Sequence, residues 1–69
     1  MTVVKIIELI GSSSKSWEDA VKNAIADAAK TVRDIKSVDV KQYTAKVEKN
    51  KIVEYRADVK IAFMVKRRA

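Results

Sequence analysis

The feature that most constrains this 69-residue chain is an alternating segment near its end, residues 53–65, which read VEYRADVKIAFMV. Apolar side chains occupy every second position there, which is the period of a β-strand with one buried face. The rest of the chain has room for two more strands and a single helix, and one helix cannot cover three strands of this length. We therefore expect the protein to complete its core by assembling with copies of itself.

The composition leaves oligomerisation as the support for such a small core. A domain of this size buries only about 60% of its unfolded surface, and small domains usually add disulfides, metals or partner chains. The sequence has no cysteine and no histidine. Disulfides, zinc fingers and histidine acid–base catalysis are thereby excluded. No nucleophile–base pair can be built from histidine or cysteine, and we expect no catalytic residues and no enzyme.

The net charge of +6, from 15 basic and 9 acidic residues, keeps a different class of function open. A basic balance favours anionic partners, so a small basic nucleic-acid-binding module is the alternative to an assembling protein. Nucleic acid is the less favoured partner, because the aromatic residues are few and are not interleaved with basic ones, as in single-strand binders. The one tight basic cluster is Lys66, Arg67 and Arg68. An adaptor that docks partners at an open strand edge is a third alternative.

The location predicted from the sequence is the cytoplasm. No apolar run reaches the roughly 18 residues of a membrane-spanning helix. Residues 1–11 read MTVVKIIELIG and lack both a basic leader and a small-residue cleavage site, so they are typical of a strand and not of a signal peptide.

The sequence predicts one α+β domain, residues 1–69, with the element order β-α-β-β and a three-stranded antiparallel sheet wrapped on one helix. The predicted elements cover, in chain order, residues 3–10, 16–34, 37–49 and 52–66. The helix would cover one face of the sheet. The other face would still carry Ile, Val, Ala and Met side chains, and an uncovered apolar face of this kind indicates an interface.

Local signals support these boundaries. Ser16 with Asp19 three residues later is typical of a helix N-cap. The apolar positions of the second strand change parity between Val40 and Tyr43, which predicts a β-bulge. Asn50 lies in the turn before the last strand and tolerates the left-handed backbone that tight hairpins need.

Three stretches of the chain resemble the dodecin family. They are residues 5–13 (KIIELIGSS), residues 16–20 (SWEDA) with the alanine-rich helix that ends in KTVR, and residues 54–63 (EYRADVKIAF). The similarity spans nearly the whole chain without gaps. It implies a hollow homododecamer of cubic symmetry, with the helices outside and the sheets facing inward, which would close the uncovered face.

The resemblance also implies a ligand. Many dodecins bind flavins in pairs near two-fold axes and are regarded as flavin stores. An aromatic residue at the start of the second strand stacks on the ring system, and a glutamine on the third strand hydrogen-bonds its edge. In this sequence these positions fall on Ser37 and Arg56. Serine has no ring, and arginine offers donors only, so the site is altered from the family pattern. The resemblance still implies storage of flavin (FMN or riboflavin) or a related cofactor at this altered site.

The same resemblance points to neighbours of that site and to a second ligand. Asp39, Tyr43 and Tyr55 are candidate pocket neighbours, with Tyr43 as a substitute aromatic platform. The plainer interpretation of Arg56 is a cross-strand ion-pair ladder, and that of Tyr55 is packing. The Ser37 and Arg56 combination is similar to a divergent dodecin subgroup with calcium-binding members, so a calcium-binding dodecin without flavin is the alternative. Calcium needs several oxygen ligands, and the sequence assigns no metal-ligating residues.

Overall fold

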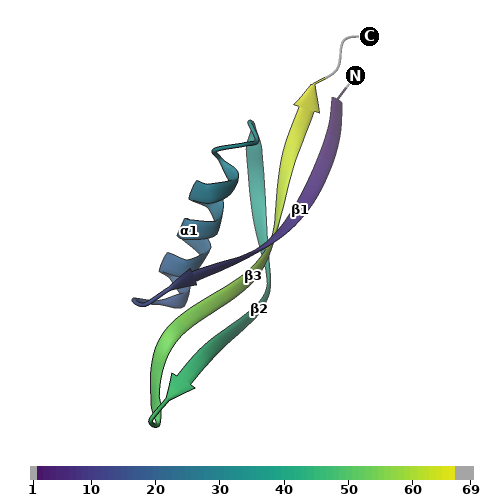
Figure 1. Cartoon of the computed structure of the whole chain (residues 1–69). Helices are drawn as coiled ribbons and strands as arrows, with labels where there is room; N and C mark the ends of the chain where they lie inside the picture. The colour runs from purple at the N-terminus through teal and green to yellow at the C-terminus, as the bar shows by residue number, and fades with distance from the viewer. Residues whose placement is uncertain (1, 67–69) are drawn as a thin grey trace.

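The computed structural model describes residues 2–66 and confirms the predicted α+β domain (Figure 1). Its elements are β1 (Thr2–Ser13), α1 (Trp17–Ala28), β2 (Ile35–Glu48) and β3 (Lys51–Lys66). Arg67 and Arg68, which belong to the basic cluster noted above, lie outside the described residues.

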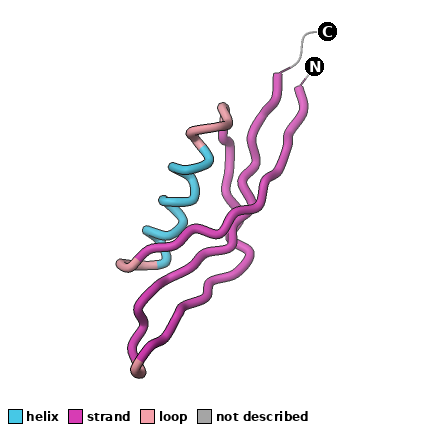
Figure 2. The backbone as a smooth tube through the Cα atoms, in the orientation of Figure 1, coloured by secondary structure: helices cyan, strands magenta, loops and turns pink. Residues whose placement is uncertain are grey.

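The sheet places β3 in its centre. The strand order is β1-β3-β2, and β3 pairs antiparallel with both neighbours, so that Ile61 is opposite Ile7 on one side and Val38 on the other. The β2–β3 hairpin projects beyond the helix, as Figure 2 shows at the bottom of the view. The register shifts between the pairs of Val40 and Gln42, which confirms the predicted bulge. The longest alternating segment is thus the strand that binds the whole sheet together.

The helix is shorter than the predicted 16–34. It begins after Ser16, whose Oγ accepts a hydrogen bond of 3.0 Å from the Asp19 backbone N–H, as the N-cap pattern predicted. It ends at Ala28, where the Lys30 and Thr31 N–H groups bond to carbonyls three residues back, a tightening common in last turns. Asp34 then adopts a positive φ of 57°, and β2 begins at the next residue, Ile35. The apolar spacing continues past this turn because Val32 and Ile35 pack on the same core.

The core is a layer of small side chains between helix and sheet. Ala20, Ala24 and Ala28 of α1 are buried against the central strand. Their partners on β3 are the buried, alternating residues Ala57, Val59 and Ile61. Because the buried side chains of the helix are alanines, its backbone lies close to β1 at Gly11. A Cβ added at Gly11 would lie 2.1 Å from the Ala20 carbonyl oxygen. Glycine is therefore required at this crossing.

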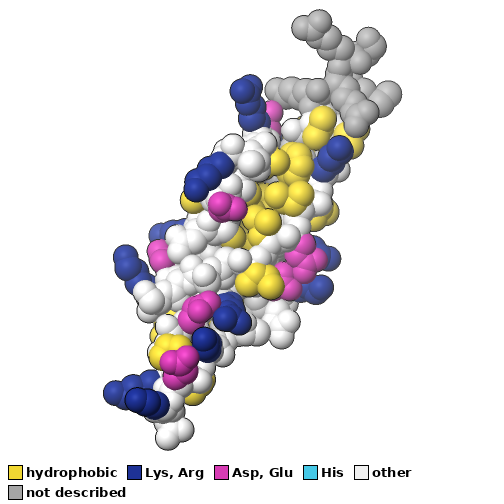
Figure 3. Space-filling model, in the orientation of Figure 1, with side chains coloured by type: hydrophobic (Ala, Val, Ile, Leu, Met, Phe, Trp, Pro, Cys, Tyr) yellow, Lys and Arg dark blue, Asp and Glu magenta, His cyan; other side chains and the backbone are white. Residues whose placement is uncertain are grey.

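The other face of the sheet has no cover in a single chain. On β1 the side chains of Val4, Ile6 and Ile10 point away from the helix and are 57%, 63% and 70% exposed. Figure 3 shows hydrophobic side chains gathered in a patch that follows the path of β1, with charged groups beside it. We call this surface, opposite α1, the open face. It is the uncovered apolar face that the sequence predicted.

Gly11→Ala should destabilise the fold by about 2–3 kcal/mol, because the new methyl group meets a backbone carbonyl that cannot move aside. The added Cβ would also lie 2.8 Å from the Cβ of Ala24. Urea unfolding at a fixed chain concentration measures the loss. Ser12→Ala, which changes the exposed side chain of the next residue, is the control, and equal midpoints for the two variants would contradict this account of the crossing.

Candidate ligand-binding face

The open face consists of rows of side chains that run across the three strands. The register places Ala62 between Ser37 and Ile6, and it places Lys60 between Asp39 and Glu8. The next two rows centre on Asp58, between Ile10 and Gln42, and on Arg56, between Ser12 and Thr44. An apolar end therefore gives way to a polar and charged middle along the same surface.

The two recognition positions inferred from the family pattern, Ser37 and Arg56, are both exposed on this face. Within one chain they lie far apart. Ser37 pairs with Ala62, six residues from Arg56 along β3, a separation of about 20 Å at the rise of a strand. A site that uses both positions on one small ligand therefore needs more than one chain, and their role in binding stays a prediction.

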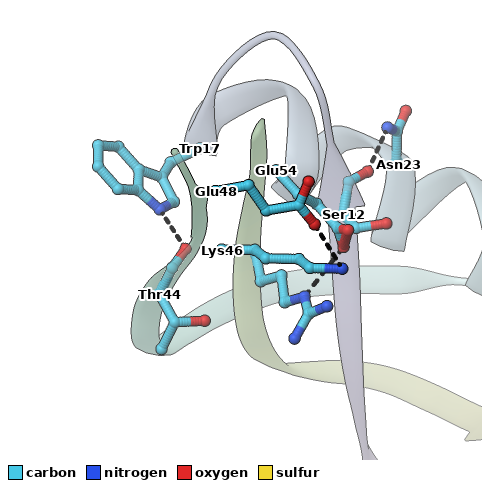
Figure 4. A network of polar contacts seen from close by, with 8 residues as sticks. Ser12, Trp17, Asn23, Thr44, Lys46, Glu48 and Glu54 are labelled. Carbon is cyan, nitrogen blue, oxygen red and sulfur yellow. Dashed lines mark hydrogen bonds and ion pairs between the residues drawn. The ribbon is translucent and has the colours of Figure 1, made fainter. Parts of the chain in front are cut away.

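The candidate neighbours divide between the two faces. Asp39 lies on the open face, whereas Tyr43 and Tyr55 lie on the helix side. There, Trp17 meets Tyr55 edge-on with ring centroids 4.8 Å apart, and meets Tyr43 at 6.0 Å with a tilt of 60°. The Trp17 indole N–H donates to the Thr44 carbonyl at 2.8 Å (Figure 4). In one chain these rings pack on one another, so neither tyrosine is a stacking platform for a ligand on the open face.

Arg56 is held by a residue of its own strand. Its Nε–H donates to Glu54 Oε1 at 2.9 Å. This hydrogen bond, together with the charge of Arg56, lowers the pKa of Glu54. The same bond and the charge of Glu54 raise the pKa of Arg56. The expected ion-pair ladder across strands is wrong for Arg56. The other ion pairs of these strands do not involve Arg56. Lys46 Nζ lies 3.4 Å from Glu48 Oε2 on the same strand (Figure 4), and Lys41 Nζ lies 3.6 Å from Glu8 Oε2.

Asp58 has an environment that the sequence did not predict. Among the described residues its Oδ1 atom is buried and has no hydrogen-bond donor. Alternation along β3 shows that Asp58 points to the open face. It does not show that Ile10 and Gln42 flank it, because that depends on the register of β1 and β2.

The described part of one chain holds neither a pocket nor a ready metal centre. Residues 2–66 enclose no cavity, and they bring no three acidic side chains together. Within the same range, no helix is both long and apolar enough to cross a membrane.

Comparison with known proteins decides the family. The model of the dodecin family matches residues 3–66. The chain belongs to the dodecin family. Dodecins are small-ligand-binding proteins that assemble as dodecamers, with flavin-binding and calcium-binding members.

Two curated dodecins are similar along nearly their whole length. The calcium dodecin of Mycobacterium tuberculosis is 32% identical over 66 residues, which cover 96% of this chain and 93% of the relative. The dodecin of Thermus thermophilus is 31% identical over 61 residues, 88% of each chain. A crystal structure from Thermus thermophilus superimposes with a TM-score of 0.93 at 28% identity, over 99% of this chain and 100% of that chain.

We expect the pKa of Glu54 to rise toward its ordinary value in Arg56→Gln, because the hydrogen bond that lowers it is lost. NMR titration of the Glu54 carboxyl measures this. Since the folded-state pKa lies below the unfolded one, the pair stabilises the fold above the ordinary Glu pKa, and this contribution is lost as the pH falls through the folded value. Lys46→Gln should raise the Glu54 pKa less, because Lys46 acts only through its charge. An unchanged pKa in Arg56→Gln would contradict the assignment.

Proposed function

We propose that this dodecin is a non-catalytic protein that assembles into a homododecamer and sequesters a small ligand on inward-facing sheet surfaces. The observation that carries the proposal is the open face, where β1 exposes three large aliphatic side chains in a single chain. A contiguous apolar surface of this kind is typical of an interface. Assembly also provides the second surface that a ligand site on this face needs.

The ligand that we propose first is a flavin, FMN or riboflavin, or a related cofactor, at a site altered from the family pattern. Serine at position 37 removes the ring that would stack, and such stacking contributes about 0.5–1.5 kcal/mol per aromatic pair. Arg56 offers no acceptor to a ring N–H and is already engaged by Glu54. We therefore propose that flavin binds more weakly here than in dodecins that have both recognition residues.

Calcium is the second candidate ligand. Its support is the similarity of this chain to the calcium dodecin of Mycobacterium tuberculosis. Calcium prefers six to eight oxygen ligands, and the described residues of one chain gather no such set. Carboxylates of the open face, such as Glu8, Asp39 and Asp58, would have to meet those of other chains. Calcium binding in this protein therefore depends on assembly.

Native mass spectrometry of the protein purified without added ligand should show the mass of twelve chains, because the open face needs cover. Mass in excess of twelve chains would identify bound flavin or calcium. A monomer at micromolar concentration would overturn the proposed cage. The basic nucleic-acid-binding alternative would then be tested by titration with single-stranded RNA at several salt concentrations, since phosphate contacts give a steep salt dependence.

Ser37→Trp should tighten FMN binding by about twofold to tenfold, because one ring–ring contact is restored. Adding Arg56→Gln should tighten it further through the restored acceptor. Quenching of flavin fluorescence on titration measures both affinities. Ser12→Trp, which places an indole elsewhere on the open face, is the matched control. If that control tightens binding as much as Ser37→Trp, position 37 has no special role in recognition.

A further inference from the structure

The middle of the open face contains an acceptor without a donor. Asp58 Oδ1 is buried and unpaired among the described residues, and its cross-strand neighbours, Ile10 and Gln42, give it no hydrogen bond. A carboxylate oxygen removed from water without a donor is unfavourable. A donor from a second chain would satisfy this oxygen.

A donor with unused capacity lies in the next row. Arg56 is flanked across the strands by Ser12 and Thr44, which are neutral. Its side chain is 46% exposed, and only its Nε–H is used, by Glu54. A guanidinium carries five N–H donors in a fixed fork, so most of them remain available. Lys60, the other cation beside Asp58, instead has an acid on each side of it.

The charges of this face suit a second copy of the same surface. Among the described side chains of its charged part, four are acidic and four are basic: Glu8, Asp39, Glu54 and Asp58 with Lys41, Lys46, Arg56 and Lys60. These eight groups sum to zero and add nothing to the net charge of +6 of the chain. Two copies of a balanced surface can meet without net repulsion, whereas an anionic partner would gain little there.

A two-fold axis would make the rows of Arg56 and Asp58 contact each other twice, once in each direction. In a two-fold interface, if residue i contacts residue j of the partner, then j contacts i. Arg56 and Asp58 are two residues apart on one face of β3, about 7 Å along the strand. A two-fold axis that lies over the open face, perpendicular to β3 and level with Ala57, places each Arg56 opposite the other chain's Asp58.

We propose that Arg56 of each chain donates to Asp58 of a second copy, forming two reciprocal ion pairs across the open face. This contact rests on the proposed assembly and specifies how two chains meet within it. Glu54 orients the guanidinium by holding Nε, and the fork of Arg56 suits a carboxylate. Arg56, one of the two positions that differ from the family pattern, is thereby an assembly contact in this chain.

Complementation between two single variants tests the contact. Arg56→Asp places two acids on each chain, and Asp58→Arg places two arginines, so each variant alone repels its own copies. On dilution, each variant should fall apart at a chain concentration on the order of tenfold or more higher than the wild type does, because like charges repel in an interface. Mixed together they restore both pairs and should assemble again. Analytical ultracentrifugation and native mass spectrometry measure the assembly and its composition.

The mixture separates a contact between chains from one within a chain, because pairing inside a chain cannot be rescued by another variant. Lys22→Asp and Asp27→Arg make the same charge changes on the exposed surface of α1 and should assemble as the wild type does. Asp58→Asn, which keeps the shape of the side chain, should also weaken assembly while circular dichroism shows a folded chain.

Three outcomes would overturn the proposal. The first is a mixture that stays dissociated although both variants are folded, and the second is single variants, Asp58→Asn included, that assemble as tightly as the wild type. Each of these rejects the Arg56–Asp58 contact and leaves the cage intact. The third is a monomeric wild type, which rejects the cage itself and this contact with it.

Discussion

The close approach of an alanine-rich helix to one face of the sheet is the constraint on which the rest of this structure depends. Gly11 lets the helix backbone reach β1 at Ala20, and Ser13 secures the crossing because its Oγ donates to Asp19 Oδ2 at 2.6 Å. Since this single short helix contains only small buried residues, it covers the centre of one sheet face and nothing more. The open face and the projecting hairpin follow directly from that limit.

This division of the sheet also divides the candidate functional residues. The aromatic rings collect on the helix side, where Trp17 packs on Tyr43 and Tyr55. The open face keeps Ser37 and Arg56 but has no ring at either position. An aromatic ligand would find its natural stacking partners on the wrong side of the sheet. The residues that remain on the open face favour polar and ionic contacts, either with a ligand or with another chain.

Much of the fold could be predicted because its signals are local. Alternation along β3 identified the buried residues Ala57, Val59 and Ile61, and a change of parity located the bulge after Val40. The end of the helix was misplaced because apolar spacing continues through Val32, although the backbone has already turned. The central place of β3, the distance from Ser37 to Arg56 and the burial of Asp58 depend on strand order and register, which no local pattern contains.

The unpaired carboxylate of Asp58 connects the burial deficit of the sequence to the chemistry of the assembly. Apolar side chains such as Ile10 explain why the open face should be covered, but they do not specify how two copies align, because hydrophobic burial is not directional. Ion pairs depend on distance and geometry, and mismatched charges in an interface are costly. The described charged groups of the open face include both acids and bases, and the acid Asp58 has an oxygen without a donor. Such a face can therefore select a single alignment among many that would bury similar area.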